Sequence, residues 1–499
     1  MKYHTGLILP DVSAVMRTGS EYLESIRDGR RILLDGKVVD DVTTHPAFSN
    51  AARAIAGLYD TQCDAEHLER MTFVSPTSGE RVSRIWQLPA TYDELVTRRL
   101  ALTRIAEQTC GMMGRSPDHV ASALAGMVIG IDVFERYDRK RAQALLDYYE
   151  YAREKDLYLS YVIINPQADK SKSASGQPDE FLVAGICDED AEGITIKGAK
   201  MLGTGAVLSD EVLVAGFQVF GDGDEKYAFT AMVPINAKGV KLLSRRSYAQ
   251  AAPSTFDYPL SSLFDENDAL IYFDEVKIPW DRVFIHRDIK MAQAQWHETQ
   301  SHVYQNYQCA IRLMVKLKFL LGIARKITET NAILDFPQVR ETMGVLAAKA
   351  GVIEGLVKGM EAGGQSHNGY FVPDRRLLCS AQVMSQTLYP EIVISIRQLA
   401  GGGMIMLPSS YQDFLDEETA DLIGRTQKSP IVDSENRVKL FKLAWDALGS
   451  EFGSRHLQYE MFYSGPTHVT RGHAFRHYDW NNATGLVDEL MDSYGLPES

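Results

Sequence analysis

The strongest constraint on the fold is a change in hydrophobic periodicity at two places along the chain. From Thr18 to about Lys155, segments such as TYDELVTRRLALTRIAEQTC carry apolar residues three and four positions apart, the spacing of an amphipathic helix. Past Tyr158 the pattern changes to short β-branched runs such as YVIIN and DEVLVAGFQVF, interrupted by Gly, Asp and Pro. After the IPW at Ile278 the helical spacing returns. We therefore predict an N-terminal helical domain, a central antiparallel β domain and a C-terminal helical bundle with a tail, at 1–157, 158–285 and 286–499.

The C-terminal part is predicted to contain several long helices. The spacing indicates helices near 338–362, 375–400 and 434–462. A further helix presents apolar residues at alternating intervals of four and three along one face, namely Val303, Tyr307, Ala310, Met314, Leu317 and Leu321. Helices with such faces pack into a bundle, and bundles of this kind commonly bury helix faces between protomers.

Charge and cysteine content limit the partners and the compartment. The 52 Lys and Arg against 66 Asp and Glu give a net charge of -14, which repels phosphate backbones and anionic lipid surfaces. No stretch reaches the roughly 18 apolar residues of a membrane span, so we expect neither nucleic acid nor membrane as a partner. A reducing cytoplasm is favoured because the cysteines are odd in number and never form a CxxC pair; they are Cys63, Cys110, Cys187, Cys309 and Cys379.

Several common motifs are missing. An oxidoreductase with its own nicotinamide site usually carries GxGxxG between a strand and a helix, and this chain has none. GTGAVL at Gly203 lacks the third glycine, GDGDEK at Gly221 is typical of a turn, and AGGGM at Ala400 follows a predicted helix. His473 and His477 stand four residues apart without an acidic ligand in the pattern, so we expect no metal site.

Extended blocks of sequence are more informative than short motifs. These blocks are MRTGSEYLESIRDGRRILLDGKVVDDVTTHPAF at Met16, GRSPDHV at Gly114, FDYPLSSLFDENDALIYFDEVKIPWDRVFIHRD at Phe256, and LPSSYQDF with RVKLFKLAWDALGSEFGSRHLQYEMFYSG near the C-terminus. From Met16 to Tyr478 the chain resembles the 4-hydroxyphenylacetate 3-monooxygenase large-component family, the two-component FADH2-dependent aromatic and chlorophenol monooxygenases. The resemblance implies an acyl-CoA dehydrogenase-like fold, mainly α with a central β-barrel and a C-terminal four-helix bundle, assembled as a homotetramer.

The resemblance also implies a reaction. The chain would hydroxylate a small phenolic or other electron-rich aromatic substrate with FADH2 and O2 through a C4a-hydroperoxyflavin. FAD would arrive reduced, by diffusion, from a separate NAD(P)H:flavin reductase, in agreement with the missing nicotinamide motif. Because a phenol has a pKa near 10 in water, a base or cationic donor at its hydroxyl would raise the electron density of the ring. A nitrogen heterocycle such as an indole or pyrrole is an alternative substrate.

A second alternative is a lyase like the more distantly related 4-hydroxybutyryl-CoA dehydratase. That branch holds an iron–sulfur cluster through three cysteines and one histidine. His302 and Cys309 stand in the H-x6-C arrangement and Cys110 aligns with the first cysteine, but the second position of the C-x3-C pair is Gly114. Because cluster stability depends on soft thiolate ligands, the missing cysteine favours the monooxygenase.

Four residues are predicted to act in catalysis on the basis of the resemblance. Arg115 and His119 of GRSPDH match the arginine and the aromatic or histidine side chain that contact the substrate, and their spacing places them on one helix face. His302 resembles the proposed base of the halophenol branch, and Thr204 falls where a hydroxyl reaches flavin N5 or the C4a adduct. The alternatives are a loop ion pair for Arg115, packed core positions for the histidines and a strand-end turn for Thr204.

The resemblance further implies flavin and substrate contacts. Tyr161 in YVIINPQADKS replaces a histidine of the hydroxyphenylacetate enzymes, so a substrate hydroxyl would meet a weaker base. The predicted flavin contacts are Tyr161, Gln167, Ala168, Asp169, Lys170, Thr204, Tyr463, Ser464, Gly465 and Pro466. The predicted substrate contacts are Arg115, His119 and Tyr161 with an apolar wall that excludes water, or is ordinary core, at Gly216, Phe217 and Phe452.

Overall fold

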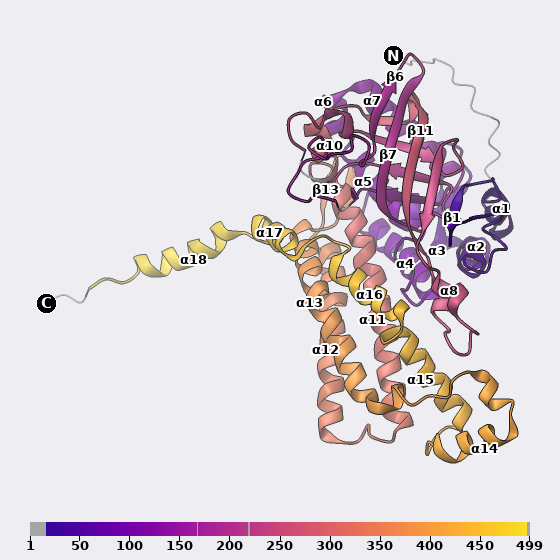
Figure 1. Cartoon of the computed structure of the whole chain (residues 1–499). Helices are drawn as coiled ribbons and strands as arrows, with labels where there is room; N and C mark the ends of the chain where they lie inside the picture. Colours follow the sequence, from indigo (N-terminus) through magenta and orange to yellow (C-terminus); the bar gives the residue numbers. More distant parts are fainter. Residues whose placement is uncertain (1–15, 167, 218–219, 497–499) are drawn as a thin grey trace.

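Capping residues mark the beginnings of the N-terminal helices. The computed structural model describes residues 16–166, 168–217 and 220–496, and Figure 1 shows their arrangement. The Thr18 hydroxyl accepts from the Glu21 amide at the start of α1 (Gly19–Ser25). The Asp138 carboxylate does the same for the first turn of α7 (Arg139–Glu154). Between them lie α2 (Ser49–Cys63), α3 (Leu68–Met71), α4 (Tyr92–Gln108), α5 (Asp118–Ile129) and α6 (Ile131–Tyr137).

Two β-sheets make up the central part. The larger one has the strand order β2 (Lys37–Val39), β1 (Ile32–Leu34), β10 (Val240–Ser244), β11 (Asp268–Pro279), β7 (Gly193–Thr204) and β6 (Gly185–Glu189). The smaller one has the order β12 (Val283–Ile285), β9 (Thr230–Pro234), β8 (Glu211–Val214) and β5 (Leu159–Val162). Most neighbours are antiparallel, as predicted, but β1 with β10 and β5 with β8 are parallel. Short helices α8 (Tyr248–Ala251) and α9 (Ser261–Phe264) connect β10 to β11.

Within the described residues the two sheets do not close into the predicted central β-barrel. A barrel requires the edge strands to pair and remove every free edge, whereas among the described residues the isolated bridge between Ile164 and Met201 is the only backbone pairing between the two sheets. Strands β1 and β2 come from the segment predicted to be helical and extend the larger sheet. The domain limits at 157 and 285 stay a prediction.

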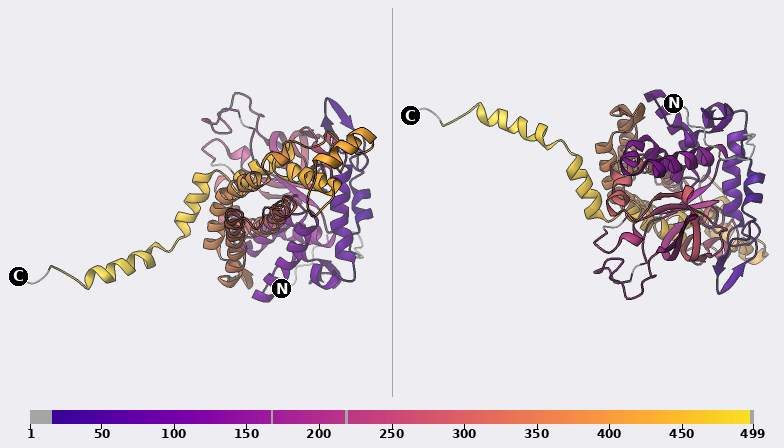
Figure 2. Two further views of the ribbon diagram at one scale, coloured as in Figure 1. Left: turned by 90° about the horizontal axis from the view of Figure 1, so that it is seen from below. Right: turned by 90° about the horizontal axis from the view of Figure 1, so that it is seen from above.

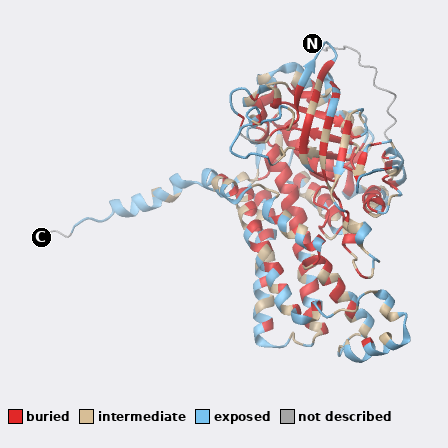
Figure 3. Cartoon of the chain, in the orientation of Figure 1, coloured by how far each residue is buried: buried red, intermediate tan, exposed pale blue. Residues whose placement is uncertain are grey.

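The C-terminal part is a bundle built around one long helix. α11 (Ser301–Thr330) packs against α4 and α5 on one side and against α12 (Pro337–Ala362), α13 (Arg375–Ala400) and α15 (Ser434–Leu448) on the other. Its first thirteen residues are all buried, as the red colouring of its upper half in Figure 3 shows. Only one apolar face was predicted, but the N-terminal helices cover the opposite face too. α14 (Glu417–Thr426) and α16 (Glu451–Phe462) complete this part of the chain. α10 (Ile289–His297) contacts α11, the hairpin of β3 (Thr72–Val74) and β4 (Arg81–Ser83) contacts α3 and α7, and the hairpin of β13 (Gln365–His367) and β14 (Tyr370–Val372) contacts α4.

The chain ends in an arm that leaves the body of the molecule. α17 (Thr467–His477) packs on α13, while α18 (Trp480–Asp492) projects away from every other element in Figures 1 and 2. No residue of α18 is buried. Among the described helices, none combines the length and apolarity needed to cross a membrane.

Candidate active site

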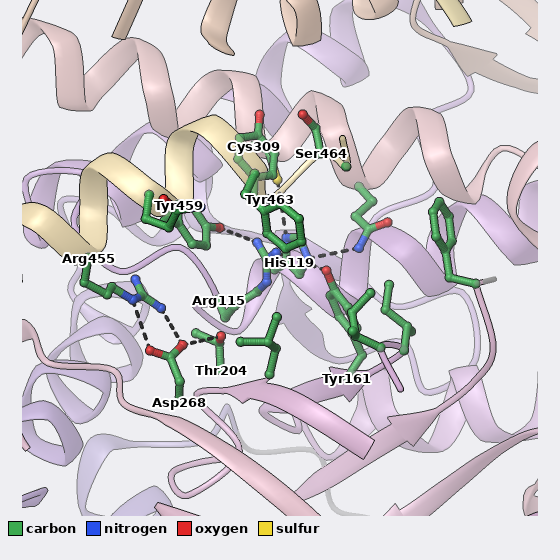
Figure 4. A pocket seen from close by; sticks show the side chains of 18 of the residues that line it. Arg115, His119, Tyr161, Thr204, Asp268, Cys309, Arg455, Tyr459, Tyr463 and Ser464 are labelled. Carbon is green, nitrogen blue, oxygen red and sulfur yellow. Dashed lines mark hydrogen bonds and ion pairs between the residues drawn. The ribbon is translucent and has the colours of Figure 1, made fainter. Parts of the chain in front are cut away.

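A cavity of about 810 Å³ lies between the sheets, α5, α11 and α16. Figure 4 shows its polar side chains converging from these elements. The residues that line it include Arg115, His119, Tyr161, Ile163, Ile164, Leu202, Thr204, Phe217, Arg245, Arg246, Tyr248, Asp268, Trp296, His302, Gln305, Asn306, Cys309, Glu451, Arg455, Tyr459, Tyr463, Ser464, Gly465 and Pro466.

Arg115 is held by tyrosines on two sides. It lies in the loop between α4 and α5, where its amide donates to Glu266 Oε2 at 2.8 Å and its carbonyl accepts from the Tyr158 hydroxyl at 2.6 Å. Its guanidinium donates to the Tyr459 hydroxyl and, at 3.0 Å, to the Tyr161 hydroxyl. Gly114 makes this possible, because a Cβ at that position would lie 2.6 Å from Cζ of Tyr459.

His119 is a neutral imidazole with both nitrogens engaged. Gln305 Nε2 lies 3.0 Å from His119 Nε2, and Gln308 Oε1 lies 3.0 Å from His119 Nδ1, so the glutamines define the tautomer protonated on Nδ1. Burial, assisted by the charge of Arg115, holds the pKa of His119 well below its usual value. The ring stacks on Tyr161 with centroids 5.3 Å apart.

Thr204 belongs to a half-buried ionic group at the end of β7. Its hydroxyl donates to Asp268 Oδ1 at 2.6 Å, and the same carboxylate binds Arg455 at 2.6 Å and Arg245 at 2.8 Å. Burial alone would raise the pKa of Asp268, but the two guanidinium groups outweigh it and hold this pKa well below its usual range. Because the Thr204 hydroxyl donates in this bond, the lone pairs of its oxygen are not used by Asp268.

His302 stands in a group of three histidines. Its ring centroid lies 5.2 Å from that of His297 and 5.5 Å from that of His473, and those two lie 5.0 Å apart. Gln382 Nε2 approaches His302 Nε2 at 3.4 Å. Burial, with the neighbouring histidines, holds the pKa of His302 well below its usual value. No group of three or more His, Cys, Asp or Glu side chains in the described chain is arranged to hold a metal ion.

The turn from α16 to α17 closes the cavity at its C-terminal wall. Gln386 of α13 fixes this turn, since its amide donates to the carbonyls of Met461 at 3.0 Å and Gly465 at 2.8 Å and accepts from the Thr470 hydroxyl at 2.8 Å. Gly465 has a φ of 104°, which only glycine adopts readily. The buried Oγ of Ser464 has no hydrogen-bond partner among the described residues and lies at the cavity wall.

Comparison with known proteins assigns the chain. Residues 18–285 match the family model "4-hydroxyphenylacetate 3-hydroxylase N terminal" and residues 292–492 the model "4-hydroxyphenylacetate 3-hydroxylase C terminal". The chain belongs to the 4-hydroxyphenylacetate 3-hydroxylase family. It is 34% identical to the 4-hydroxyphenylacetate 3-monooxygenase oxygenase component of Geobacillus sp. (strain PA-9), over 90% of this chain and 91% of that protein.

Solved structures agree with this family assignment. The oxygenase component HpaB in complex with FAD and 4-hydroxyphenylacetate has a TM-score of 0.90 at 30% identity and covers 96% of this chain and 98% of its own. An archaeal 4-hydroxybutyryl-CoA dehydratase from N. maritimus shares the fold, with a TM-score of 0.87 at 21% identity over 97% of each chain. The predicted family is thus confirmed.

The structure places most of the predicted site residues of this hydroxylase at the cavity. Ten of them line the cavity: Arg115, His119, Tyr161, Thr204, Phe217, His302, Tyr463, Ser464, Gly465 and Pro466. Ala168, Asp169 and Lys170 are exposed in the loop after β5 and do not line it, and Gln167 lies outside the described residues. The roles of all of these residues stay predictions.

Gly216 and Phe452 lie behind the cavity wall. The Gly216 carbonyl accepts from Trp296 Nε1 at 2.9 Å, and a Cβ there would overlap the Phe220 ring. Phe452 is buried against His456, with ring centroids 4.3 Å apart, and faces a neighbouring cavity. Both residues therefore support the wall from behind, and their predicted substrate contacts have no counterpart in the lining.

Sequence reasoning missed the charged and tyrosine side chains of the site, above all Arg245, Asp268, Arg455 and Tyr459. Asp268, Arg455 and Tyr459 lie in the blocks that carry the resemblance, whereas Arg245 lies outside them. Their contacts join distant positions, which are 187 residues apart for Arg455 and Asp268. The available signal was the presence of Arg455 and Glu460 inside an otherwise amphipathic helical segment. Charges placed on the buried side of a helix usually have a partner.

Proposed function

We propose that this chain is the oxygenase component of a two-component flavin monooxygenase that hydroxylates a small phenol or another electron-rich aromatic. The observation that carries the proposal is the buried guanidinium of Arg115, which faces the cavity between two tyrosine hydroxyls. Family members are 4-hydroxyphenylacetate 3-monooxygenase oxygenase components, and HpaB has been crystallised with FAD and 4-hydroxyphenylacetate. O2 and a separate NAD(P)H:flavin reductase are the implied partners.

The residues of the cavity fit FAD. Its volume of about 810 Å³ lies in the range of roughly 300–1,000 Å³ that is usual for ligand sites. Arg245, Arg246 and Arg455 offer guanidinium groups that suit a pyrophosphate, and Ser464 Oγ offers a hydrogen-bonding group without a partner among the described residues. When bound in its reduced form, FAD supplies, with O2, the electrophilic oxygen atom that is transferred.

Arg115 and Tyr161 are the groups that would bind the phenol oxygen. The permanent charge of Arg115 favours the phenolate, which lowers the pKa of the bound phenol and activates the ring. Burial raises the pKa of Tyr161 despite the adjacent Arg115, so the hydroxyl keeps its proton and can donate it in a hydrogen bond. Tyr161 thus takes the place of a histidine as a donor, and it does not act as a base.

His119 and His302 contribute in different ways to this proposal. Both nitrogens of His119 are engaged by glutamines, which makes it a stacking wall for Tyr161 and an unsuitable proton acceptor. His302 is neutral and lines the cavity, and Nδ1 has no partner among the described contacts. We therefore assign proton transfer from the substrate to His302, with the neighbouring histidines as a path towards solvent.

The dehydratase alternative is disfavoured by two observations. Tyr459 occupies the space next to Gly114, where the missing cysteine would have to extend. Cys110, His302 and Cys309 form no metal-binding group among the described residues. Similarity to the dehydratase at 21% identity concerns the fold alone.

The function is tested with the isolated chain and no reductase. We expect chemically reduced FAD, O2 and a panel of phenols to give hydroxylated product from at least one phenol. Arg115→Met should bind reduced FAD yet release peroxide in place of product, because the phenol is no longer deprotonated. Peroxide alone from every phenol would refute the proposal, while product from an indole or pyrrole only would move the substrate class to a nitrogen heterocycle.

We also propose that the hydroxylase is a homotetramer held in part by its C-terminal arm. Apolar side chains of the arm between 47% and 96% exposed are Phe475, Tyr478, Trp480, Leu486, Val487, Leu490, Met491, Tyr494 and Leu496. Together they present on the order of 1,000 Å² of surface, more than the ~800 Å² that one partner contributes to a standard interface. A second copy is the partner that supplies the same arm in return.

The acyl-CoA dehydrogenase-like architecture and a cytoplasmic location complete the proposal. The bundle of α11, α12, α13 and α15 supports the first. The second is supported by the free thiols of all five cysteines, since disulfides are rare in a reducing compartment.

A further inference from the structure

A buried group of charges lies on the side of α16 that faces away from the cavity. The Glu460 carboxylate accepts from Arg312 in a bidentate pair at 2.6 and 2.9 Å, and from Lys316 Nζ at 2.9 Å. Lys316 Nζ also lies 3.0 Å from His456 Nδ1. The side chains of Arg312, Lys316 and Glu460 are at most 1% exposed. None of these side chains lines the cavity.

Arg312 connects this group to both partners in the Arg115–Tyr459 contact. Its Nη1 donates to the Gly111 carbonyl at 3.1 Å, in the loop that leads to Arg115. Its guanidinium lies 5.2 Å from the centroid of the Tyr459 ring. Gly111 has a φ of 70°, and a Cβ there would lie 2.7 Å from Cβ of Lys316, so the loop lies directly against α11.

Tyr459 and Glu460 are consecutive, so they project in directions about 100° apart around α16. Tyr459 faces Arg115 in the cavity, while Glu460 faces α11. The rotation of α16 that lets Glu460 meet the fork of Arg312 is therefore the rotation that brings the Tyr459 hydroxyl to Arg115. A bidentate carboxylate–guanidinium pair is satisfied in one orientation only.

Stability alone does not account for such a group. Replacing a buried ion pair with well-packed apolar residues is often neutral or stabilising, and α16 has apolar contacts through Phe452. What the ionic group adds over apolar packing is a fixed geometry.

We propose that Glu460 is a positioning residue that, through Arg312, fixes Tyr459 and the Arg115 loop for substrate binding. This inference rests on the proposed role of Arg115 at the phenol oxygen. It goes beyond that role because it attributes the precise placement of the Arg115 guanidinium to the Glu460 carboxylate, which would touch neither substrate nor cofactor.

The test is a double-mutant cycle on KM and on the dissociation constant of the phenol. Tyr459→Phe removes a hydrogen bond to a charged group and should raise both about tenfold with little change in kcat. Glu460→Gln should raise them by a similar factor. If Glu460 acts through Tyr459, the double variant is no weaker than either single one, whereas effects that multiply to about a hundredfold would overturn the inference.

Further variants separate geometry from charge and from folding. Arg312→Lys keeps the charge but loses the fork, and it should raise KM as Glu460→Gln does. Lys316→Met leaves the bidentate pair intact and should keep KM within about twofold. If Glu460→Gln does not fold, the cycle is run with Arg312→Lys and Tyr459→Phe. An unchanged KM for Arg312→Lys would refute the positioning role.

Glu354→Gln is the matched control, because it removes the same charge from an exposed pair with Lys358 on α12. It should leave KM unchanged. Phenol binding and hydroxylation by the wild-type protein separate a failure of the proposed function from a failure of the positioning role of Glu460. If it neither binds nor hydroxylates any phenol, the proposed function fails; if it does both and the cycle is additive, only the positioning role fails.

Discussion

Lys200 provides the sharpest quantitative prediction from this structure. It lies in β7 with no exposed surface, and its Nζ donates to Asn165 Oδ1 at 2.8 Å. Burial lowers the pKa of this lysine from 10.5 to about 7. Because the folded pKa lies below the unfolded one, the unfolded chain binds the extra proton between these values. The free energy of unfolding therefore rises with pH in this window, by up to about 1.4 kcal/mol per pH unit from this group alone.

Lys200→Met removes this dependence. Between pH 7 and pH 9 the wild type gains stability from this group and the variant does not. We therefore expect the free energy of unfolding of the variant minus that of the wild type to decrease by about 2 kcal/mol over this range. Urea titrations followed by circular dichroism, at one protein concentration, measure the difference. The control is Lys197→Met on the same strand, which breaks an ion pair with Glu275 at 2.9 Å but removes no lysine of lowered pKa. Equal pH slopes for wild type and Lys200→Met would refute the reasoning.

Three further predictions concern the site and the assembly. Tyr161→Phe removes one donor to the phenol oxygen, so the dissociation constant of the phenol should rise about tenfold in equilibrium binding, and an unchanged constant would contradict the donor role. Gln386→Leu leaves the α16–α17 turn without three hydrogen bonds, so the dissociation constant of reduced FAD should rise severalfold in anaerobic titration, and an unchanged constant would show that the turn does not hold the flavin. Ending the chain after His477 removes α18 and most of the apolar arm, and light scattering should then report a smaller species; an unchanged mass would show that the arm does not hold the assembly.

The general order of the fold could be predicted from periodicity. Helices predicted at 338–362 and 375–400 are found at Pro337–Ala362 and Arg375–Ala400. The predicted helix at 434–462 is divided into α15 and α16 near Gly449, where a Cβ would lie 2.6 Å from the Trp445 ring and Ser450 caps the next helix. Strands β1 and β2 were missed, since each has three residues and gives no measurable alternation.

The match to the family located individual residues of the cavity lining, but not the contacts between them. Arg115, His119 and His302 could be found as matches to the family, and all three line the cavity. The contact between Arg115 and Tyr459 joins residues 344 positions apart, and no local pattern reports such a pairing. Asp169 and Lys170, which the resemblance places at the flavin, are exposed in the loop after β5 and do not line the cavity, so their flavin contacts stay a prediction.

Two groups of ion-paired side chains, one half-buried and one buried, lie beside the cavity and fix the placement of its side chains. In the first group, the Asp268 carboxylate accepts hydrogen bonds from Arg245, Arg455 and Thr204. In the second, the Glu460 carboxylate accepts from Arg312 and Lys316. Removing such ions from water costs several kcal/mol each, and the pairs recover this only with good geometry. Each group holds α16 at one residue, the first at Arg455 and the second at Glu460, so the rotation of this helix and its position along its axis are both fixed. Tyr459 lies between these two residues in the sequence, and the position of its hydroxyl next to Arg115 is therefore fixed as well. The Arg115 guanidinium, the donor that would bind the substrate oxygen, therefore has a position that is set during folding. Because this donor needs no reorganisation at the moment of reaction, its hydrogen bond lowers the energy of a developing phenolate.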